Sequence, residues 1–257
     1  MSEPEDPAAA RLGRERVFHD DLAAELDPAR MPKMPLSDLD AAMIAEARVG
    51  PGIRVLDLGC GSGDLTLHLV AAGAEVAALD LSPRMLEVAQ RRVELFGEGA
   101  TATFVAAPVE RTGFPDAHFD VVVGRFILHH LDVGTAAVEI ARILRPGGQA
   151  VFAENSGRNG LLMLARRHVA GRAGVPRLGT EDEHPLSAGD VAAIGSAFSS
   201  VQLRYPVFEF FTIFDRQVFR FGHPRVSRVL RTADRMVGRA PLLARYSFRV
   251  IVVLGRD

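Results

Sequence analysis

The chain has 257 residues and a formal net charge of −2, with 48% hydrophobic and 24% charged side chains. This size and composition are typical of a globular protein that buries its own core. A single cysteine, Cys60, excludes an intrachain disulfide and a zinc site built on several cysteines. The first 16 residues lack the apolar region of a secretory signal, and no apolar run approaches a membrane span, so we expect a cytoplasmic protein.

The N-terminal 50 residues have a helical pattern. Mixed charge with apolar residues at helical spacing predicts one helix over residues 14–26. Three prolines then interrupt the chain, and a second helix is expected over residues 36–48, capped by Ser37 or Asp38. We expect residues 1–50 to form a helical lid on a main domain of residues 51–257.

Strands alternate with helices from residue 53 onward. This alternation predicts a parallel sheet with right-handed crossovers. The expected strands are 53–58, 75–80, 101–106, 119–124 and 149–154, and the expected helices are 65–72, 83–96 and 132–144. Pro83 suits the first turn of its helix, Asp132 is a candidate cap, and the turn Arg145–Gly148 is expected to end the last helix.

The last hundred residues are less regular. We expect helices at 161–170 and 187–197, the second capped by Ser187, a loop between them, and strands at 201–205 and 246–254. Residues 207–244 have the character of an insertion. Its six phenylalanines, 208, 210, 211, 214, 219 and 221, either wall an apolar acceptor pocket or form the core of a helical cap.

The C-terminal part is basic. Residues 1–154 hold 14 basic and 24 acidic side chains, whereas residues 155–257 hold 16 and 8. Within 225–239 the periodicity places Val226, Val229, Leu230, Ala233 and Val237 on one helical face and Arg225, Arg228, Arg235 and Arg239 largely on another. Together with Arg166, Arg167 and Arg172, this pattern fits either a solvated helix or peripheral contact with an anionic membrane.

A glycine-rich loop carries the most specific signal. The segment VLDLGCGSGDLT, from Val55 to Thr66, passes from a strand through three glycines into a helix. Such a loop lets a ligand lie against the backbone. Asp80 ends the next strand, where a carboxylate can accept hydrogen bonds from ribose hydroxyls. The loop and this acid predict an adenosine-type cofactor at the carboxyl ends of parallel strands.

The motif differs from the dinucleotide fingerprint, because Asp64 stands where the third glycine is required. The pattern Asp-x-Gly-x-Gly-x-Gly from Asp57 to Gly63 instead resembles class I S-adenosylmethionine-dependent methyltransferases. So do FPDAHFDVV (Phe114–Val122), ILHHL (Ile127–Leu131) and LRPGG (Leu144–Gly148), which follow in order. The resemblance covers residues 50–155. It implies an α/β, Rossmann-like sheet of seven mostly parallel strands with helices on both faces.

The resemblance also implies roles for individual residues. The methionine part of S-adenosylmethionine would contact Asp57 and the backbone of Gly59, Cys60 and Gly61. Asp80 would bind the ribose, and Leu81 and Met85 would line the adenosine pocket. The Arg125 backbone would contact the cofactor amino group. One position departs from the family. Pro108 stands where many relatives carry the acid that binds adenine, so that contact would pass to the Val109 backbone, to apolar side chains or to Glu110.

The expected reaction is methyl transfer to a small-molecule acceptor, more at oxygen than at nitrogen or carbon, on a secondary metabolite or lipid-like compound. A hydroxyl acceptor needs a general base. The candidates follow strands four and five or lie in the later loop: His129, His130, Glu154 and His184, with His129 and Glu154 best placed. His19 is expected to pin the N-terminal helix as a lid. No metal is expected.

Two other functions remain open on the sequence. One is a nicotinamide-dependent oxidoreductase on a related sheet, which Asp64 disfavours. The other is a cofactor-binding module without turnover, which Pro108 favours and the intact Gly59, Gly61 and Asp80 disfavour. Nucleic acid is disfavoured as a substrate, because the chain has neither an RNA-binding module nor an NPPY-type motif after strand four.

Overall fold

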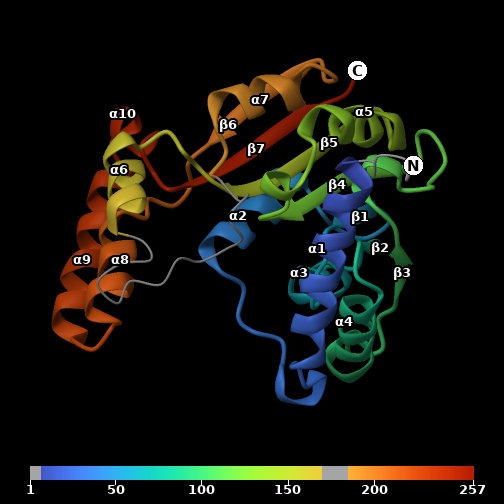
Figure 1. Cartoon of the computed structure of the whole chain (residues 1–257), viewed down its shortest axis with the longest axis horizontal. Coiled ribbons are helices and arrows are strands. Elements are labelled where there is room, and N and C mark those ends of the chain that lie inside the picture. The colour runs from blue at the N-terminus through green and yellow to red at the C-terminus, as the bar shows by residue number, and fades with distance from the viewer. Residues whose placement is uncertain (1–6, 170–184) are drawn as a thin grey trace, which may run out of the picture.

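The computed structural model describes residues 7–169 and 185–257. Its described part contains a seven-stranded sheet in the order β3-β2-β1-β4-β5-β7-β6 (Figure 1). The strands are β1 (Arg54–Leu58), β2 (Glu75–Asp80), β3 (Ala102–Ala106), β4 (Phe119–Arg125), β5 (Leu144–Asn155), β6 (Ser200–Arg204) and β7 (Arg249–Gly255). Neighbours from β3 to β5 pair in parallel, and β7 is antiparallel to both β5 and β6. The predicted Rossmann-like fold is confirmed.

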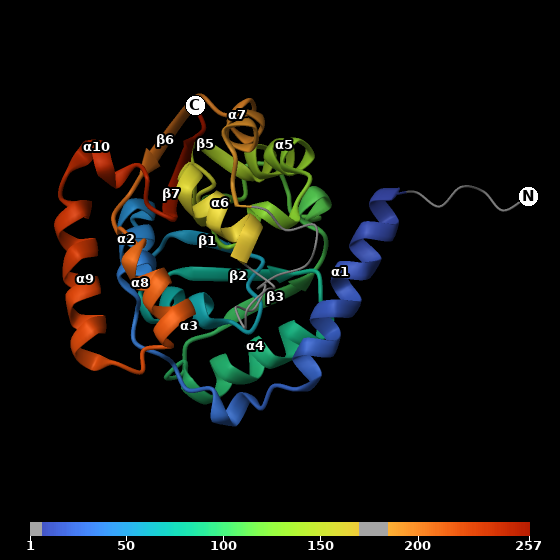
Figure 2. The ribbon, with the colours of Figure 1, turned by 60° about the vertical axis from the view of Figure 1, so that its left-hand side comes forward.

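Helices cover both faces of this sheet (Figure 2). They are α1 (Pro7–Ala24), α2 (Asp38–Ala47), α3 (Asp64–Ala71), α4 (Pro83–Phe96), α5 (Val133–Ile143), α6 (Gly160–Val169), α7 (Ala188–Gly195), α8 (Phe211–Phe214), α9 (Pro224–Gly238) and α10 (Pro241–Ala244). Short 3-10 helices occur at Pro28–Arg30, Val109–Arg111 and Leu128–His130, and a π-helical turn at Asp215–Phe219. α2, α3 and α4 lie on one face, α5 and α7 on the other, and α1 packs against α4.

Each face of the sheet buries its own apolar core. Leu56 and Leu58 pack with Ile140 of α5 on one face, whereas Val55 packs with Met43 of α2 on the other. Both sets are buried, as expected for parallel strands covered on two sides. The short apolar strands of the sequence therefore lie at the centre of the molecule.

Local capping signals are confirmed at three helix starts. Ser37, Asp132 and Ser187 each accept a hydrogen bond from the backbone N–H three residues later. At Ser187 the interaction is reciprocal, because the Asp190 carboxylate also accepts the Ser187 N–H.

Several boundaries differ from the prediction. α1 begins at Pro7 instead of residue 14, and β7 begins at Arg249 instead of residue 246. The predicted turn at 145–148 belongs to β5, because the Gly147 N–H donates to the Arg256 carbonyl and the Arg256 N–H to the Gly148 carbonyl. The β4–β5 register shifts beside this segment. A loop was predicted to follow the helix at 161–170 and to extend to His184 and Pro185. Of this loop, only Pro185 is among the described residues.

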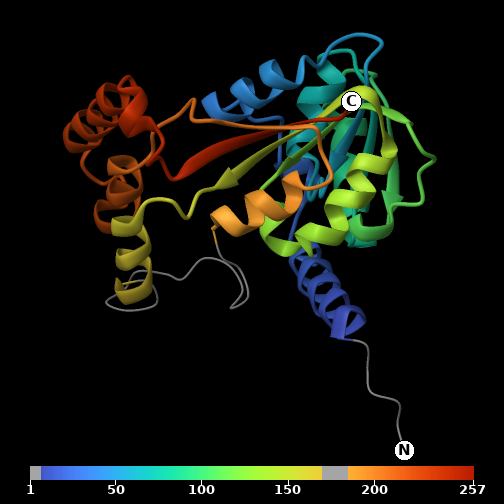
Figure 3. The ribbon, with the colours of Figure 1, turned by 90° about the horizontal axis from the view of Figure 1, so that it is seen from above.

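The C-terminal insertion folds into α8, α9 and α10, which lie with α6 beyond the carboxyl end of β5 (Figure 3). Of the five apolar residues predicted to share one face of α9, Leu230, Ala233 and Val237 are half-buried. Ser227 and Asp234 are its buried residues, whereas Val226 and Val229 are exposed. No helix of the described residues is long and apolar enough to cross a membrane.

Candidate functional site

The glycine loop lies between β1 and α3, at the carboxyl edge of the sheet. Its three glycines, Gly59, Gly61 and Gly63, have φ of 68°, 50° and 80°. A Cβ on Gly59 would lie 2.6 Å from Ile127 Cδ1, and one on Gly63 would lie 2.9 Å from Ala89 Cβ. A Cβ on Gly61 would meet nothing within 4 Å. Two glycines therefore serve packing, and Gly61 borders open space where a ligand can approach the backbone.

Asp80 holds this loop in place. Its Oδ2 accepts the Gly61 N–H at 2.8 Å, and its Oδ1 accepts the Ser82 N–H at 2.9 Å. The Leu79 carbonyl accepts the N–H groups of Gly59 and Cys60 at 2.8 and 3.0 Å. Sequence reasoning assigned Asp80 to ribose alone and missed this anchoring. Because each carboxylate oxygen has a second lone pair, both roles are compatible.

Asp57 is a buried acid beneath the loop. The Thr66 hydroxyl donates to its Oδ2 at 2.6 Å. Burial raises the pKa of Asp57 to about 6, against the lowering effects of the Thr66 hydrogen bond and of the Arg125 charge. A carboxylate held in such a place is stabilised by a cationic group, so Asp57 fits the ammonium of a methionine moiety.

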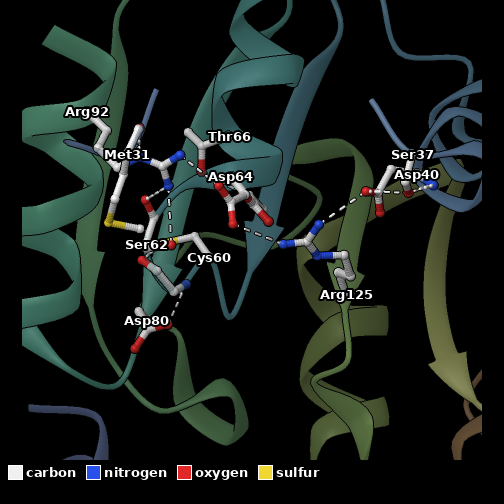
Figure 4. A network of polar contacts seen from close by, with 12 residues as sticks. Met31, Ser37, Asp40, Cys60, Ser62, Asp64, Thr66, Asp80, Arg92 and Arg125 are labelled. Atoms are coloured by element: carbon white, nitrogen blue, oxygen red, sulfur yellow. Dashed lines mark hydrogen bonds and ion pairs between the residues drawn. The ribbon is translucent and has the colours of Figure 1, made fainter. Parts of the chain in front are cut away.

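A network of two arginines surrounds the loop (Figure 4). Arg92 of α4 has a buried side chain that donates to the Ser62 carbonyl at 2.7 Å and to Asp64 at 2.7 Å. Arg125, at the end of β4, pairs with Asp40 of α2 at 3.1 Å and with Asp64 at 3.4 Å. Sequence reasoning gave Arg125 only a backbone contact and did not find Arg92. The sequence feature that could have indicated these arginines was Asp64, which stands where the dinucleotide fingerprint requires glycine and which pairs with both of them.

Helix α1 is fastened over the same edge of the sheet. Arg11 donates to the His130 carbonyl and, at 2.6 Å, to Glu110. Glu15 Oε2 lies 3.5 Å from His130 Nδ1 and 3.7 Å from His19 Nε2. His19 thus lies at the contact between α1 and the segment after β4, with its ring centroid 6.0 Å from that of His130.

The proposed adenosine-lining residues lie near α1. Met85 is buried and packs with Ala23 of α1, and the Ser82 hydroxyl donates to Asp20 of α1 at 2.5 Å. Leu81 is half-buried. In this arrangement Met85 is in contact with α1.

Pro108, the position that departs from the family pattern, is followed by residues that already contact other parts of the protein. Pro108 precedes the 3-10 turn in which Val109 is buried in the core. Glu110 accepts from Arg11 and, at 3.4 Å, from the Asp132 N–H. A contact between Glu110 and adenine would first have to break the Arg11 pair.

Glu154 and His129 form a pair at the end of β5. The buried Glu154 accepts the N–H groups of Ile127 and Leu128 at 2.7 Å each through Oε1. Its Oε2 lies 3.0 Å from His129 Nδ1, and the His129 side chain is 9% exposed. The carboxylate thereby fixes both the backbone of this segment and the orientation of the imidazole. His184 lies outside the described residues.

The aromatic insertion shows an unusual acid. The six phenylalanines of residues 208–221 are half-buried or exposed, and none belongs to the fully buried core. Asp215 is buried in the same segment, and among the described residues neither of its carboxylate oxygens has a hydrogen-bond partner. Sequence patterning found the phenylalanines but missed this acid. In the described residues, no group of three or more potential ligands is arranged for a metal ion.

Comparison with known proteins agrees with this geometry. A family model described as a methyltransferase domain matches residues 56–152. An uncharacterized protein of Mycobacterium tuberculosis is 35% identical over 123 residues, 48% of this chain and 44% of that protein. The ubiquinone/menaquinone biosynthesis C-methyltransferase UbiE of Shewanella piezotolerans is 35% identical over 117 residues, 44% of this chain and 47% of that protein. The matches thus span about half the length of these curated relatives.

A solved structure extends the likeness of the fold. Phosphoethanolamine N-methyltransferase 2 of Haemonchus contortus, in complex with S-adenosyl-L-methionine, has a TM-score of 0.57 and 18% identity, covering 85% of this chain and 52% of that one. The family model contains the glycine loop, Asp80 and the strands that follow. Residues 56–152 therefore match a methyltransferase domain, and this part of the chain is similar to S-adenosylmethionine-dependent methyltransferases.

Proposed function

We propose that this protein transfers the methyl group of S-adenosylmethionine to a hydroxyl oxygen of a small organic acceptor. The observation that carries the proposal is the convergence of Asp57, Gly61 and Asp80 at one edge of the sheet. A buried acid, an open backbone position and a second acid suit the ammonium, the carboxylate-bearing chain and the ribose of this cofactor. A dinucleotide pyrophosphate would instead lie near the acid groups of Asp57 and Asp64.

The remaining cofactor contacts follow from position. The Gly59–Gly61 backbone would run along the methionine part, and Leu81 and Met85 would border the adenosine. Arg125 and Val109 would contribute backbone groups. When bound, the cofactor supplies an electrophilic methyl group, and the protein positions the acceptor for in-line attack.

His129 is proposed as the general base. Because Glu154 accepts at Nδ1, the neutral imidazole carries its proton there, and Nε2 is the nitrogen that takes the hydroxyl proton. Glu154 acts as a positioning residue that stabilises the imidazolium formed. The pair resembles in logic other acid–histidine arrangements that activate a hydroxyl.

Carbon methylation next to a hydroxyl is a second candidate. It is favoured by the 35% identity to C-methyltransferases over 117 residues. Proton removal by His129 would serve both reactions, since a phenolate attacks through oxygen or through the neighbouring carbon. We favour oxygen because it requires only the base and the in-line placement proposed above. An apolar, secondary-metabolite-like or lipid-like acceptor suits the phenylalanine-rich insertion.

The test uses S-adenosylmethionine with a labelled methyl group and a panel of simple phenols, prenylated phenols and aliphatic alcohols. Label transfer, with the position assigned by NMR of the product, distinguishes oxygen from carbon. His129→Gln should lower turnover by about 10²–10⁴ while leaving cofactor binding intact. The matched control is His118→Gln, because His118 precedes β4 at the opposite edge of the sheet and should leave turnover unchanged. Unchanged turnover in His129→Gln would refute the base assignment.

A further inference from the structure

Helix α9 is oriented by a charged anchor. The Asp234 carboxylate accepts the N–H groups of Phe210, Phe211 and Thr212 at 3.0, 2.9 and 2.7 Å, and so caps the start of α8. Asp234 and Ser227, two turns apart on the same face, are the buried residues of α9. This polar line faces the protein, and it fixes which residues of α9 face outward.

The outward side of α9 is partly apolar. Val229 and Met236, seven residues apart, are 67% and 66% exposed. Leu242 and Leu243 of α10 are 72% and 49% exposed. We call these four residues, with the arginines of α9, the α9–α10 surface. Isolated exposed apolar residues are common, whereas these four lie close together in the chain on two successive helices, and clustered exposure of this kind is what an interaction site requires.

The same surface is strongly basic. Five exposed arginines, Arg225, Arg228, Arg231, Arg235 and Arg239, lie along α9. None of them forms an ion pair with an acidic side chain of the described residues. Between residues 216 and 256 the chain has ten arginines and one acidic residue, the buried Asp234. The positive charge of the surface is therefore not neutralised from within this segment.

We propose that the α9–α10 surface docks on an anionic lipid membrane, with the apolar side chains in the interface and the arginines at the lipid phosphates. In all three ribbon views α9 lies at the outer edge of the molecule (Figures 1, 2 and 3). A helix with basic and apolar exposed stripes is suited to lie in a membrane interface. The inference is independent of methyl transfer.

Other occupants fit these observations less well. A second copy of the chain would bring five like-charged arginines against five others across a two-fold axis. Nucleic acid would match the arginines, but it would give Val229, Met236, Leu242 and Leu243 no apolar environment, and none of these four is an aromatic residue that stacks on bases. A membrane interface matches both stripes at once.

The experiment is co-sedimentation of the full chain with vesicles of phosphatidylcholine alone and of phosphatidylcholine mixed with phosphatidylglycerol. The protein should sediment with the anionic vesicles only, and less so as salt rises. Replacing Arg228, Arg235 and Arg239 together by glutamine should weaken binding about 100-fold, since each arginine near the surface contributes about fivefold. The double variant Val229→Ser with Met236→Ser should weaken it by at least about tenfold.

Matched controls separate this surface from general charge and apolarity. Arg84, Arg91 and Arg111, all exposed elsewhere, are replaced together by glutamine, and the exposed Val138 of α5 by serine. These controls should leave vesicle binding unchanged, and every variant should retain the unfolding temperature of the parent.

Three results would overturn the proposal. One is no sedimentation with anionic vesicles, and another is equal sedimentation with neutral vesicles. The third is binding that the α9 variants and the controls reduce alike. Labelled duplex DNA and RNA are measured at the same salt. Binding of either that the arginine variant abolishes, without vesicle binding, would assign the surface to nucleic acid instead.

Discussion

The substitution Asp57→Asn removes a carboxylate whose burial lowers the free energy of unfolding of the protein in the absence of ligand. The pKa of Asp57 in the folded protein is about 6, against 3.8 for the ordinary group, mainly because of burial. At about 1.4 kcal/mol per pKa unit, ionised Asp57 lowers the free energy of unfolding by about 3 kcal/mol. Asparagine keeps an acceptor for Thr66 but leaves amide donors to satisfy, at about 1 kcal/mol. The variant should therefore gain about 2 kcal/mol, a rise in Tm of about 4–8 °C.

The raised pKa of Asp57 determines how the free energy of unfolding changes with pH. Below pH 3.8 Asp57 is protonated in both the folded and the unfolded chain, so its ionisation does not lower the free energy of unfolding. Between 3.8 and about 6 the folded state binds more protons, so the stability contributed by the protonated acid is lost as pH rises, by up to about 1.4 kcal/mol per unit. The gain of Asp57→Asn over the parent should therefore grow from about pH 4 to pH 6 and remain constant above it.

The assay is thermal unfolding of both proteins without ligand across this pH range, and then with S-adenosylhomocysteine. The variant should lose the ligand-induced rise in Tm, because the cofactor ammonium has lost its carboxylate. A variant that is less stable than the parent at about pH 8 would refute the reasoning, since ionised Asp57 would then be a net stabilising group. A pH-independent difference would refute it as well.

Two further substitutions and one reagent test other parts of the molecule. Gly63→Ala should lower the free energy of unfolding by about 1–3 kcal/mol, because φ is +80° and the new Cβ would lie 3.1 Å from the Ala89 Cα. Thermal unfolding measures this loss, and an unchanged Tm would contradict the prediction. Glu139→Gln should lower stability near neutral pH by about 1–2 kcal/mol, because hydrogen bonds from Arg142 and Thr112 lower the pKa of Glu139 to about 2. Since this folded-state pKa is depressed from 4.5, the difference between parent and variant should shrink as pH falls from 4.5 toward about 2. Cys60 should react slowly with a thiol reagent in the folded protein and fully after denaturation, because burial and the charges of Asp57 and Asp80 raise the pKa of its thiol; equal rates would contradict the burial.

The parts of the fold that local sequence determines were predictable. Buried strands such as β1 and β2 are short and mostly apolar, and helix caps such as Ser37 and Asp132 bind backbone groups three residues away. The order of strand, glycine loop and helix also placed Asp80 at the correct edge of the sheet. These features depend on short stretches of chain, so the residue pattern alone indicates them.

The parts that depend on distant contacts were not predictable. The hydrogen bond from Arg92 to the Ser62 carbonyl joins segments 30 residues apart, and the Arg125–Asp40 pair spans 85 residues. The rotation of α9 likewise follows from Asp234, which caps α8 from a distance in the chain. Apolar periodicity grouped the half-buried Leu230, Ala233 and Val237 with the exposed Val226 and Val229, because it contains no information about that cap.

Ligand-dependent thermal unfolding tests the cofactor site most directly. The protein is heated alone and with S-adenosylhomocysteine, S-adenosylmethionine or NAD in large excess, together with an Asp80→Ala variant that still unfolds cooperatively. A ligand at about 100 times its Kd stabilises by about 2.7 kcal/mol, which raises Tm by about 5–11 °C. The account predicts this rise with both sulfur nucleosides, none with NAD, and no rise in the variant. A rise with NAD alone, or with no ligand, would contradict the proposed cofactor site.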